Sequence, residues 1–177
     1  MNKVKMIYKE FALSLSNRHH FFPVSKISSF YGINSDTFMS LWDYDEDVIE
    51  YVKSNKTLSG YRGKLYMPDE FILDVDGANI DQAKQLTHGL IDLLNIPMQV
   101  YFSGEKGFHI HISGTAFKWK PCKDLNLRVK HTLKNYGIYD FADPLVIDKV
   151  RLIRIPNTKK LSSGYWKVPI KISEIDD

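Results

Sequence analysis

Phe71-Ile-Leu-Asp-Val-Asp76 is the stretch that decides the fold, because an apolar run carries two carboxylates at a spacing of two. Alternate side chains of a β-strand point to the same face of a sheet. Asp74 and Asp76 are therefore predicted to face one spot. Two carboxylates that close repel each other unless a cation lies between them. Because Mg²⁺ and Mn²⁺ prefer such oxygen ligands, the stretch predicts a strand that ends in a divalent metal site.

A glycine-containing turn follows in Tyr101-Phe-Ser-Gly-Glu-Lys-Gly-Phe-His-Ile-His111. Glycine lets the backbone approach an anion closely, so residues 103–107 can offer N–H groups and a hydroxyl to phosphates. The strand after the turn carries His109 and His111 on one face. A carboxylate pair beside such a turn indicates nucleotide chemistry. Asp76 has one simpler interpretation, as the N-cap of the helix that the sequence predicts next.

Periodicity along the chain predicts an α/β fold. Apolar recurrence predicts helices over 2–15, 36–54, 79–94 and from Pro121 to about Tyr136, and strands over 61–66, 70–75, 98–103, 108–112, 138–147 and 165–170. The order β-α-β-β-α-β from 70 to 147 is the split β-α-β pattern, which predicts an RRM-like catalytic sheet with an additional N-terminal portion. We expect a single domain over 1–177, with a helical portion over about 1–58 and a catalytic core over about 59–177. The acidic run from Asp43 to Asp47 is interpreted as a solvated helix face.

Length and composition limit the possibilities. The 177 residues are 44% hydrophobic and 13% aromatic, which is typical of one packed globular domain. The single cysteine, Cys122, excludes an internal disulfide and a thiolate zinc cluster. No stretch approaches the roughly 20 apolar residues of a membrane span, and no signal peptide opens the chain, so we expect a cytoplasmic protein. Residues 89–177 hold 14 Lys and Arg against 9 Asp and Glu, and this basic excess suits phosphate binding.

Three motifs in this order resemble the archaeo-eukaryotic primase superfamily. They are the Asp-x-Asp after an apolar strand, the Ser-Gly-x-x-Gly-x-His turn, and an Asp upstream of Arg-Leu-Ile-Arg-x-Pro. The third motif reads Asp143-Pro-Leu-Val-Ile-Asp148-Lys-Val-Arg-Leu-Ile-Arg154-Ile-Pro-Asn-Thr158. The resemblance covers residues 59 to about 170, and it includes the primase-polymerases of phages and plasmids.

The resemblance implies a template-directed nucleotidyltransferase, a DNA primase or primase-polymerase that makes or extends primers on single-stranded DNA. It implies two Mg²⁺ or Mn²⁺ ions, an NTP or dNTP substrate, and a helicase or an accessory domain or subunit as a further partner. It places catalytic metal ligands at Asp74 and Asp76 and a third at Asp143, with Asp148 as the alternative. Asp143 is preferred because it lies eight residues before Arg151 and Pro144 imposes a turn after it. The nucleotide-binding residues that it implies are Ser103, Gly104, Lys106, Gly107, His109, Arg154 and Lys160.

The chain departs from the pattern of the family at two positions. Many primases carry two basic residues within the glycine turn, whereas here the pair is Glu105 and Lys106. Lys160 stands where the family has a histidine, although a lysine can still serve as a point charge for phosphate. The zinc-binding cysteines of cellular primases and a helicase-type phosphate loop are also missing from the sequence.

The sequence is also compatible with two other functions. His109-Ile-His111 is also the metal-binding pair of HUH single-strand nucleases, for which Tyr136 or Tyr139 could serve as nucleophile. A non-enzymatic RRM-like module would instead stack nucleic-acid bases on Tyr101, Phe102 and Phe108. The nuclease interpretation leaves the Asp-x-Asp stretch and the Arg-Leu-Ile-Arg segment without a role. The aromatic residues of the RRM-like interpretation are more simply explained as part of the hydrophobic core.

Overall fold

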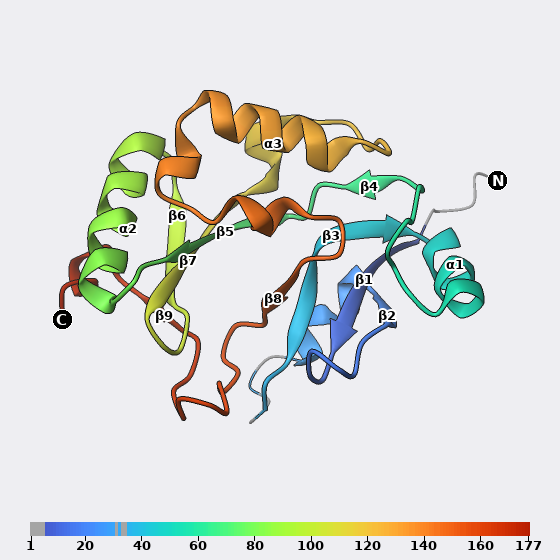
Figure 1. Cartoon of the computed structure of the whole chain (residues 1–177), viewed down its shortest axis with the longest axis horizontal. Coiled ribbons are helices and arrows are strands. Elements are labelled where there is room, and N and C mark those ends of the chain that lie inside the picture. Colours follow the sequence, from blue (N-terminus) through green and yellow to red (C-terminus); the bar gives the residue numbers. More distant parts are fainter. Residues whose placement is uncertain (1–5, 31, 33–34) are drawn as a thin grey trace.

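The computed structural model describes residues 6–30, 32 and 35–177 and contains two antiparallel sheets that lie against each other (Figure 1). The strands are β1 (Ile7–Ala12), β2 (His20–Pro23), β3 (Phe38–Asp45), β4 (Leu65–Tyr66), β5 (Glu70–Asp76), β6 (Met98–Phe102), β7 (Gly107–Ser113), β8 (Leu152–Arg154) and β9 (Val168–Ile170). The helices are α1 (Asp47–Asn55), α2 (Ile80–Leu94) and α3 (Leu125–Asn135). Short 3₁₀ helices are η1 (Val24–Phe30), η2 (Gly114–Phe117), η3 (Ile138–Asp140), η4 (Pro144–Ile147) and η5 (Ile172–Glu174).

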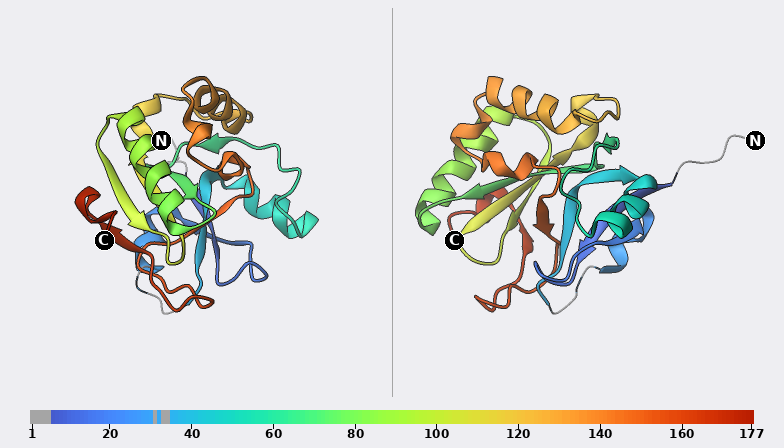
Figure 2. Two further views of the ribbon diagram at one scale, coloured as in Figure 1. Left: turned by 60° about the vertical axis from the view of Figure 1, so that its left-hand side comes forward. Right: turned by 45° about the vertical axis from the view of Figure 1, so that its right-hand side comes forward.

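The four-stranded sheet has the order β5-β7-β6-β9 and carries the predicted motifs. Antiparallel pairing places Asp74 opposite His109 and Asp76 opposite Gly107. Apolar side chains of the opposite face, such as Leu73 and Ile110, are fully buried, and α2 and α3 cover this sheet in Figure 2. The predictions of strands near 70–75, 98–103 and 108–112 and of the helix over 79–94 are therefore confirmed.

The fourth strand lies elsewhere than the sequence predicted. Residues 138–147 form η3 and η4 in place of a strand, because Gly137 takes a left-handed conformation and Pro144 begins a tight turn. The edge beside β6 is taken by β9, which covers only part of the predicted strand over 165–170. The unit β5-α2-β6-β7 has the split β-α-β order, but the complete RRM-like arrangement does not form.

The N-terminal portion is mainly a sheet, so its predicted helical character is wrong. Residues 7–12 and 38–45 are β1 and β3, and only the end of the predicted second helix is helical, as α1. Residues 1–5 and the proposed helix cap at Asn34 lie outside the described residues. Almost every residue of β3 is buried, and a strand buried on both faces shows no alternation that separates it from a helix.

Charged side chains inside this first sheet correct a further prediction. Asp43 and Asp45 of the acidic run are buried and not solvated. Lys9 forms an ion pair with Asp43 and donates to the carbonyl oxygens of Ser40 and Leu41. The charge that Asp43 carries into the core is therefore paired, as buried charges usually are.

One apolar core runs through both sheets. It includes Met39, Leu41 and Trp42 from β3 as well as Phe71 and Leu73 from β5. The sheets are also joined through the chain, because β8 pairs with β3 whereas β9, soon after it, pairs with β6. The described helices include none that is long and apolar enough to span a membrane.

Candidate active site

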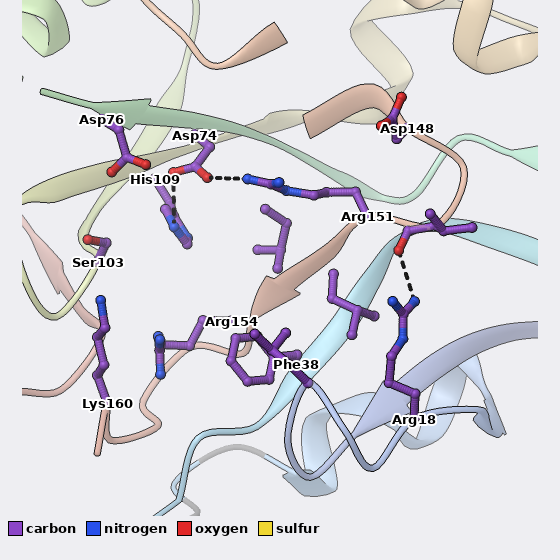
Figure 3. Close-up of a pocket in the computed structure, with 14 residues that line it drawn as sticks. Arg18, Phe38, Asp74, Asp76, Ser103, His109, Asp148, Arg151, Arg154 and Lys160 are labelled. Atoms are coloured by element: carbon purple, nitrogen blue, oxygen red, sulfur yellow. Dashed lines mark hydrogen bonds and ion pairs between the residues drawn. The ribbon is translucent and has the colours of Figure 1, made fainter. Parts of the chain in front are cut away.

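The two sheets enclose a cavity of about 470 Å³ that gathers most of the predicted site residues (Figure 3). Its wall is lined on the polar side by Asp74, Asp76, Ser103, His109, Asp148, Arg151, Arg154 and Lys160. The opposite wall comes from the first sheet and β8, with Arg18, Phe38 and Leu152. Segments that are far apart in sequence therefore supply acidic and basic groups to one space.

Asp74 lies deepest among the carboxylates. Its Oδ1 is 3.3 Å from His109 Nε2, and its Oδ2 accepts from Arg151 Nη2 at 3.4 Å. Burial alone would raise the pKa of Asp74, but His109 and Arg151 together lower it. Asp74 is therefore ionised at neutral pH. Burial lowers the pKa of His109, so its imidazole is neutral.

Asp76 stands at the outer end of β5, on the same face as Asp74. Burial and the neighbouring charges of Asp74 and Asp143 raise the pKa of Asp76, although Lys106 and Lys160 partly offset them. Asp76 does not cap α2, because the Asn79 side chain accepts from the Gln82 N–H at 2.9 Å. The alternative interpretation of Asp76 as an N-cap is therefore wrong.

Asp143 lies beside the pair, and Asp148 lies further from it. The Asp143 N–H donates to the Asp74 carbonyl oxygen at 2.8 Å, which fixes the two chain segments side by side. Arg151 Nη2 also donates to Asp143 Oδ2 at 3.0 Å, so one guanidinium bridges Asp143 and Asp74. Asp148 lines the cavity, but its carboxylate points away from Asp74 in Figure 3.

The glycine turn closes against the end of β5. The Ser103 N–H donates to the Gly107 carbonyl oxygen at 2.9 Å, and Gly104 takes a positive φ of 97°, which disfavours other residues. A Cβ at residue 107 would lie 2.5 Å from Asp76 Oδ1. Gly107 is therefore required for the turn to approach the carboxylate. Lys106 is exposed and lies outside the cavity wall.

The two departures from the family pattern contact each other. Lys160 forms an ion pair with Glu105, and the Ser163 hydroxyl donates to the Gly104 carbonyl oxygen. These contacts attach the segment after β8 to the glycine turn. The cation of Lys160 is thus balanced by a carboxylate that the family pattern does not contain.

Arg154 is balanced in the same way, by Asp36. The guanidinium forms an ion pair with this carboxylate and lies 5.1 Å from the centre of the Phe38 ring. The second oxygen of Asp36 accepts from the Leu161 N–H at 3.2 Å. Asp36 begins the helix predicted over 36–54, and no sequence motif indicates its pairing with Arg154.

Two arginines that the sequence analysis left unassigned also line the cavity. Arg151 lies just before β8, and its guanidinium reaches Asp74. Arg18 donates through both Nε and Nη2 to the buried Glu10 carboxylate and to the Val150 carbonyl oxygen at 2.9 Å. The position of Arg151 within the motif could have identified it, whereas Arg18 lies between the helices predicted over 2–15 and 36–54, outside every motif.

His111 belongs to a buried polar chain next to the cavity. Its Nδ1 is 2.9 Å from Glu70 Oε2, and Lys167 Nζ lies 3.1 Å from its Nε2 and donates to the Arg154 carbonyl oxygen at 2.9 Å. Burial lowers the pKa of His111 to about 3 and holds that of Lys167 well below its usual value. His111 is therefore neutral, and Lys167 connects β7 to the backbone of Arg154.

These contacts argue against the two other functions. The histidines face different partners, whereas an HUH nuclease requires both on one ion. Tyr136 lines a separate cavity with Ile112, whose side chain points to the face of β7 opposite His111. The aromatic side chains of the proposed RRM-like module are engaged in packing, since Phe108 is buried beside Phe102 and Tyr101 stacks on His111.

Comparisons with known proteins give one informative likeness. No protein-family model matches the chain, and no curated protein matches it. The chain is similar to the solved structure of the polymerase domain from Mycobacterium tuberculosis ligase D in complex with DNA, with a TM-score of 0.53 and 13% identity. The fold is shared with a DNA polymerase domain. The match covers 96% of this chain but 64% of the other, so the chain spans less than two thirds of that domain's length.

The raised pKa of Asp76 predicts a stability change with pH. The folded state holds the Asp76 proton more tightly than the unfolded chain, so wild-type stability falls as pH rises from the unfolded value of 3.8 through the folded pKa. Asp76→Asn removes this loss, and we expect the variant to unfold at higher urea concentration than wild type at pH 7. The difference should shrink as the pH approaches about 4. A variant that is less stable than wild type at pH 7 would contradict the proposed repulsion.

The ion pair between Glu105 and Lys160 predicts that Glu105 competes with bound anions. Glu105→Gln releases Lys160, so we expect tripolyphosphate to bind up to about 5-fold more tightly, as suits an exposed pair worth at most about 1 kcal/mol. Isothermal titration calorimetry measures this affinity. Lys160→Gln is the matched control and should bind more weakly than wild type. Equal affinities for all three proteins would show that Lys160 does not contact the anion.

Proposed function

We propose that the chain is a template-directed nucleotidyltransferase, a primase or primase-polymerase that joins nucleotides on a single-stranded DNA template. The observation that carries the proposal is that Asp74 and Asp76, at the end of β5, face basic segments across one cavity while Asp143 is held beside Asp74 by its N–H and by Arg151. The fold shared with a DNA polymerase domain supports the same class of chemistry.

The three carboxylates fit a site for divalent cations. The pKa of Asp76 is raised partly by Asp74 and Asp143, and a bound cation would relieve this repulsion. We propose that Asp74, Asp76 and Asp143 hold two Mg²⁺ or Mn²⁺ ions and that Arg151 neutralises two of these carboxylates in their absence. When bound, such ions lower the pKa of an attacking hydroxyl and neutralise the charge of a leaving pyrophosphate. The described residues contain no preformed group of three or more His, Cys, Asp or Glu ligands, so Arg151 would have to move.

The reaction forms a bond between the primer 3′-oxygen and the α-phosphorus of a nucleotide while the bond to the β-phosphate breaks. We propose that the Ser103 hydroxyl and the turn from Gly104 to Gly107 approach the triphosphate, with Lys106 near its outer end. Lys160 and Arg154 supply positive charge from the opposite side once they leave Glu105 and Asp36. His109 would donate to a phosphate oxygen from its position next to Asp74.

The partners follow from the reaction class. We propose an NTP or dNTP as substrate and single-stranded DNA as template, in keeping with the DNA in the similar polymerase-domain structure. A helicase or an accessory primase subunit is a further proposed partner, since the chain resembles only a catalytic domain.

An incorporation assay with carboxylate variants tests the proposal. Asp74→Asn, Asp76→Asn and Asp143→Asn should each lower nucleotide incorporation at least about 100-fold, because metal ions contribute several kcal/mol to such reactions. Asp148→Asn is the matched control at the other acid of the motif, and it should lower nucleotide incorporation less than the other three variants. The assay uses a single-stranded template, Mn²⁺ or Mg²⁺, and labelled NTPs or dNTPs in separate reactions. A reversed ranking would make Asp148 the third ligand, and a tyrosine–DNA adduct formed without nucleotide would favour the nuclease.

The metal site can also be tested without measuring activity. At about 100 times the dissociation constant, Mn²⁺ should stabilise the wild-type protein by about 2.7 kcal/mol. That corresponds to a rise of roughly 5–10 °C in Tm for a domain of this size. Asp74→Asn and Asp143→Asn should lose most of this rise, each measured against its own metal-free Tm, whereas Asp148→Asn should keep it. The same rise in all variants would place the ion elsewhere.

A further inference from the structure

A second surface next to the catalytic cavity gathers four basic side chains. Arg62, Lys64 and Lys123 line one cavity of about 650 Å³ between α1, the segment before β4 and the start of α3. Lys149 joins them, because its Nζ donates to the Lys123 carbonyl oxygen at 2.8 Å. We call these four residues the basic track.

Backbone pairing holds the track together. The Leu65 N–H donates to the Cys122 carbonyl oxygen at 3.0 Å, and the Cys122 N–H donates back to Leu65 at 3.3 Å. This bridge fixes the segment of Arg62 and Lys64 against the segment of Lys123, and Figure 1 shows β4 beside the start of α3. The backbone positions of these basic residues are thus set by the fold.

The track continues directly from the catalytic cavity. Asp148 and Val150, the residues on either side of Lys149, both line that cavity. Lys149 therefore lies at the border between the two spaces. A chain molecule that passes through the catalytic cavity could leave it across Lys149 toward Lys123 and Lys64.

The positive charge of the track is not cancelled by nearby acids. Arg62, Lys64 and Lys123 are exposed and form no ion pair with any residue that the structure describes. Of the acids close by, Asp45 is buried, Asp47 accepts from the Tyr61 hydroxyl at 2.6 Å, and Asp124 pairs with Arg128. Asp47, at the cavity, and Asp148, at the border, are the exposed carboxylates that remain beside the four cations. The surface therefore suits a polyanion.

We propose that the basic track binds the phosphate backbone of the single-stranded template where the strand leaves the catalytic cavity. The proposal rests on the proposed polymerase function for the identity of the strand. A positively charged groove that follows the backbone is how single strands are bound without regard to sequence. The continuity with the catalytic cavity favours the template over an unrelated acidic protein, which would need no such continuity.

The test is the affinity for a fluorescein-labelled single strand of about 30 nucleotides, measured by anisotropy without nucleotide or metal. In Arg62→Gln/Lys64→Gln/Lys123→Gln, three phosphate contacts are lost. We expect the slope of log affinity against log salt to become shallower by about 2 and the affinity at 0.1 M salt to fall about 100-fold. In extension assays the KM for template should rise while the KM for nucleotide stays unchanged.

The control variant Lys26→Gln/Lys134→Gln/Lys171→Gln removes the same charge from exposed lysines elsewhere. It should bind the strand with the same affinity as wild type. If both variants lose affinity equally, net charge alone explains the loss and the proposal is overturned. Unchanged affinity in the track variant would also overturn it and leave an acidic protein as the ligand for these cations.

Strand binding is measured without catalysis, so the two proposals can fail separately. If the wild-type protein incorporates no nucleotide but its affinity for the strand depends on the basic track, the binding surface is supported and the proposed function fails. If nucleotide incorporation is normal but the affinity for the strand does not depend on the basic track, the proposed function is supported and the binding surface fails.

Discussion

The register between β5 and β7 is the constraint on which the site depends. It sets Asp74 against His109 and Asp76 against Gly107, so the carboxylates of one strand meet the glycine turn that begins the other. A slip of one residue would turn every side chain of β5 to the opposite face and send both carboxylates into the core under α2. Seven paired positions and the fully buried Phe71, Leu73 and Val75 hold the register. The same apolar residues that stabilise the sheet therefore determine where its charges point.

Charged side chains of the cavity are paired with one another. Arg151 bridges Asp74 and Asp143, Lys160 pairs with Glu105, and Arg154 pairs with Asp36. Each pair satisfies charges that would otherwise be costly to gather in a partly buried space. A metal ion and a triphosphate carry the complementary charges, so their binding would exchange internal partners for external ones. Proteins commonly have lower folding stability than they could reach because charged groups are gathered at sites that act on ligands.

Most of the predicted site residues line one cavity, whereas only part of the fold was predicted. The Asp-x-Asp strand, the glycine turn and α2 were predicted correctly because their signals are local: alternation, glycine spacing and a clear apolar stripe. The first sheet was mistaken for helices, since β3 is buried on both faces and its apolar residues also fit a helical period. Arg18 and Asp36 were missed because their roles arise from contacts between segments far apart in the sequence, which no local pattern encodes. The roles of Asp74, Asp76 and Asp143 stay predictions until the variants are measured.

The connection between the two sheets has a consequence for how substrates enter. β8 is hydrogen-bonded into the first sheet, and β9 into the second, with the segment from 155 to 167 between them. Hinge closure of two lobes would have to separate apolar side chains of the core that both sheets share. Induced fit is therefore confined to the connecting segment, which carries Lys160 and Ser163 and contacts the glycine turn. In the proposed function, selection between correct and incorrect nucleotides would then depend on the ordering of one loop.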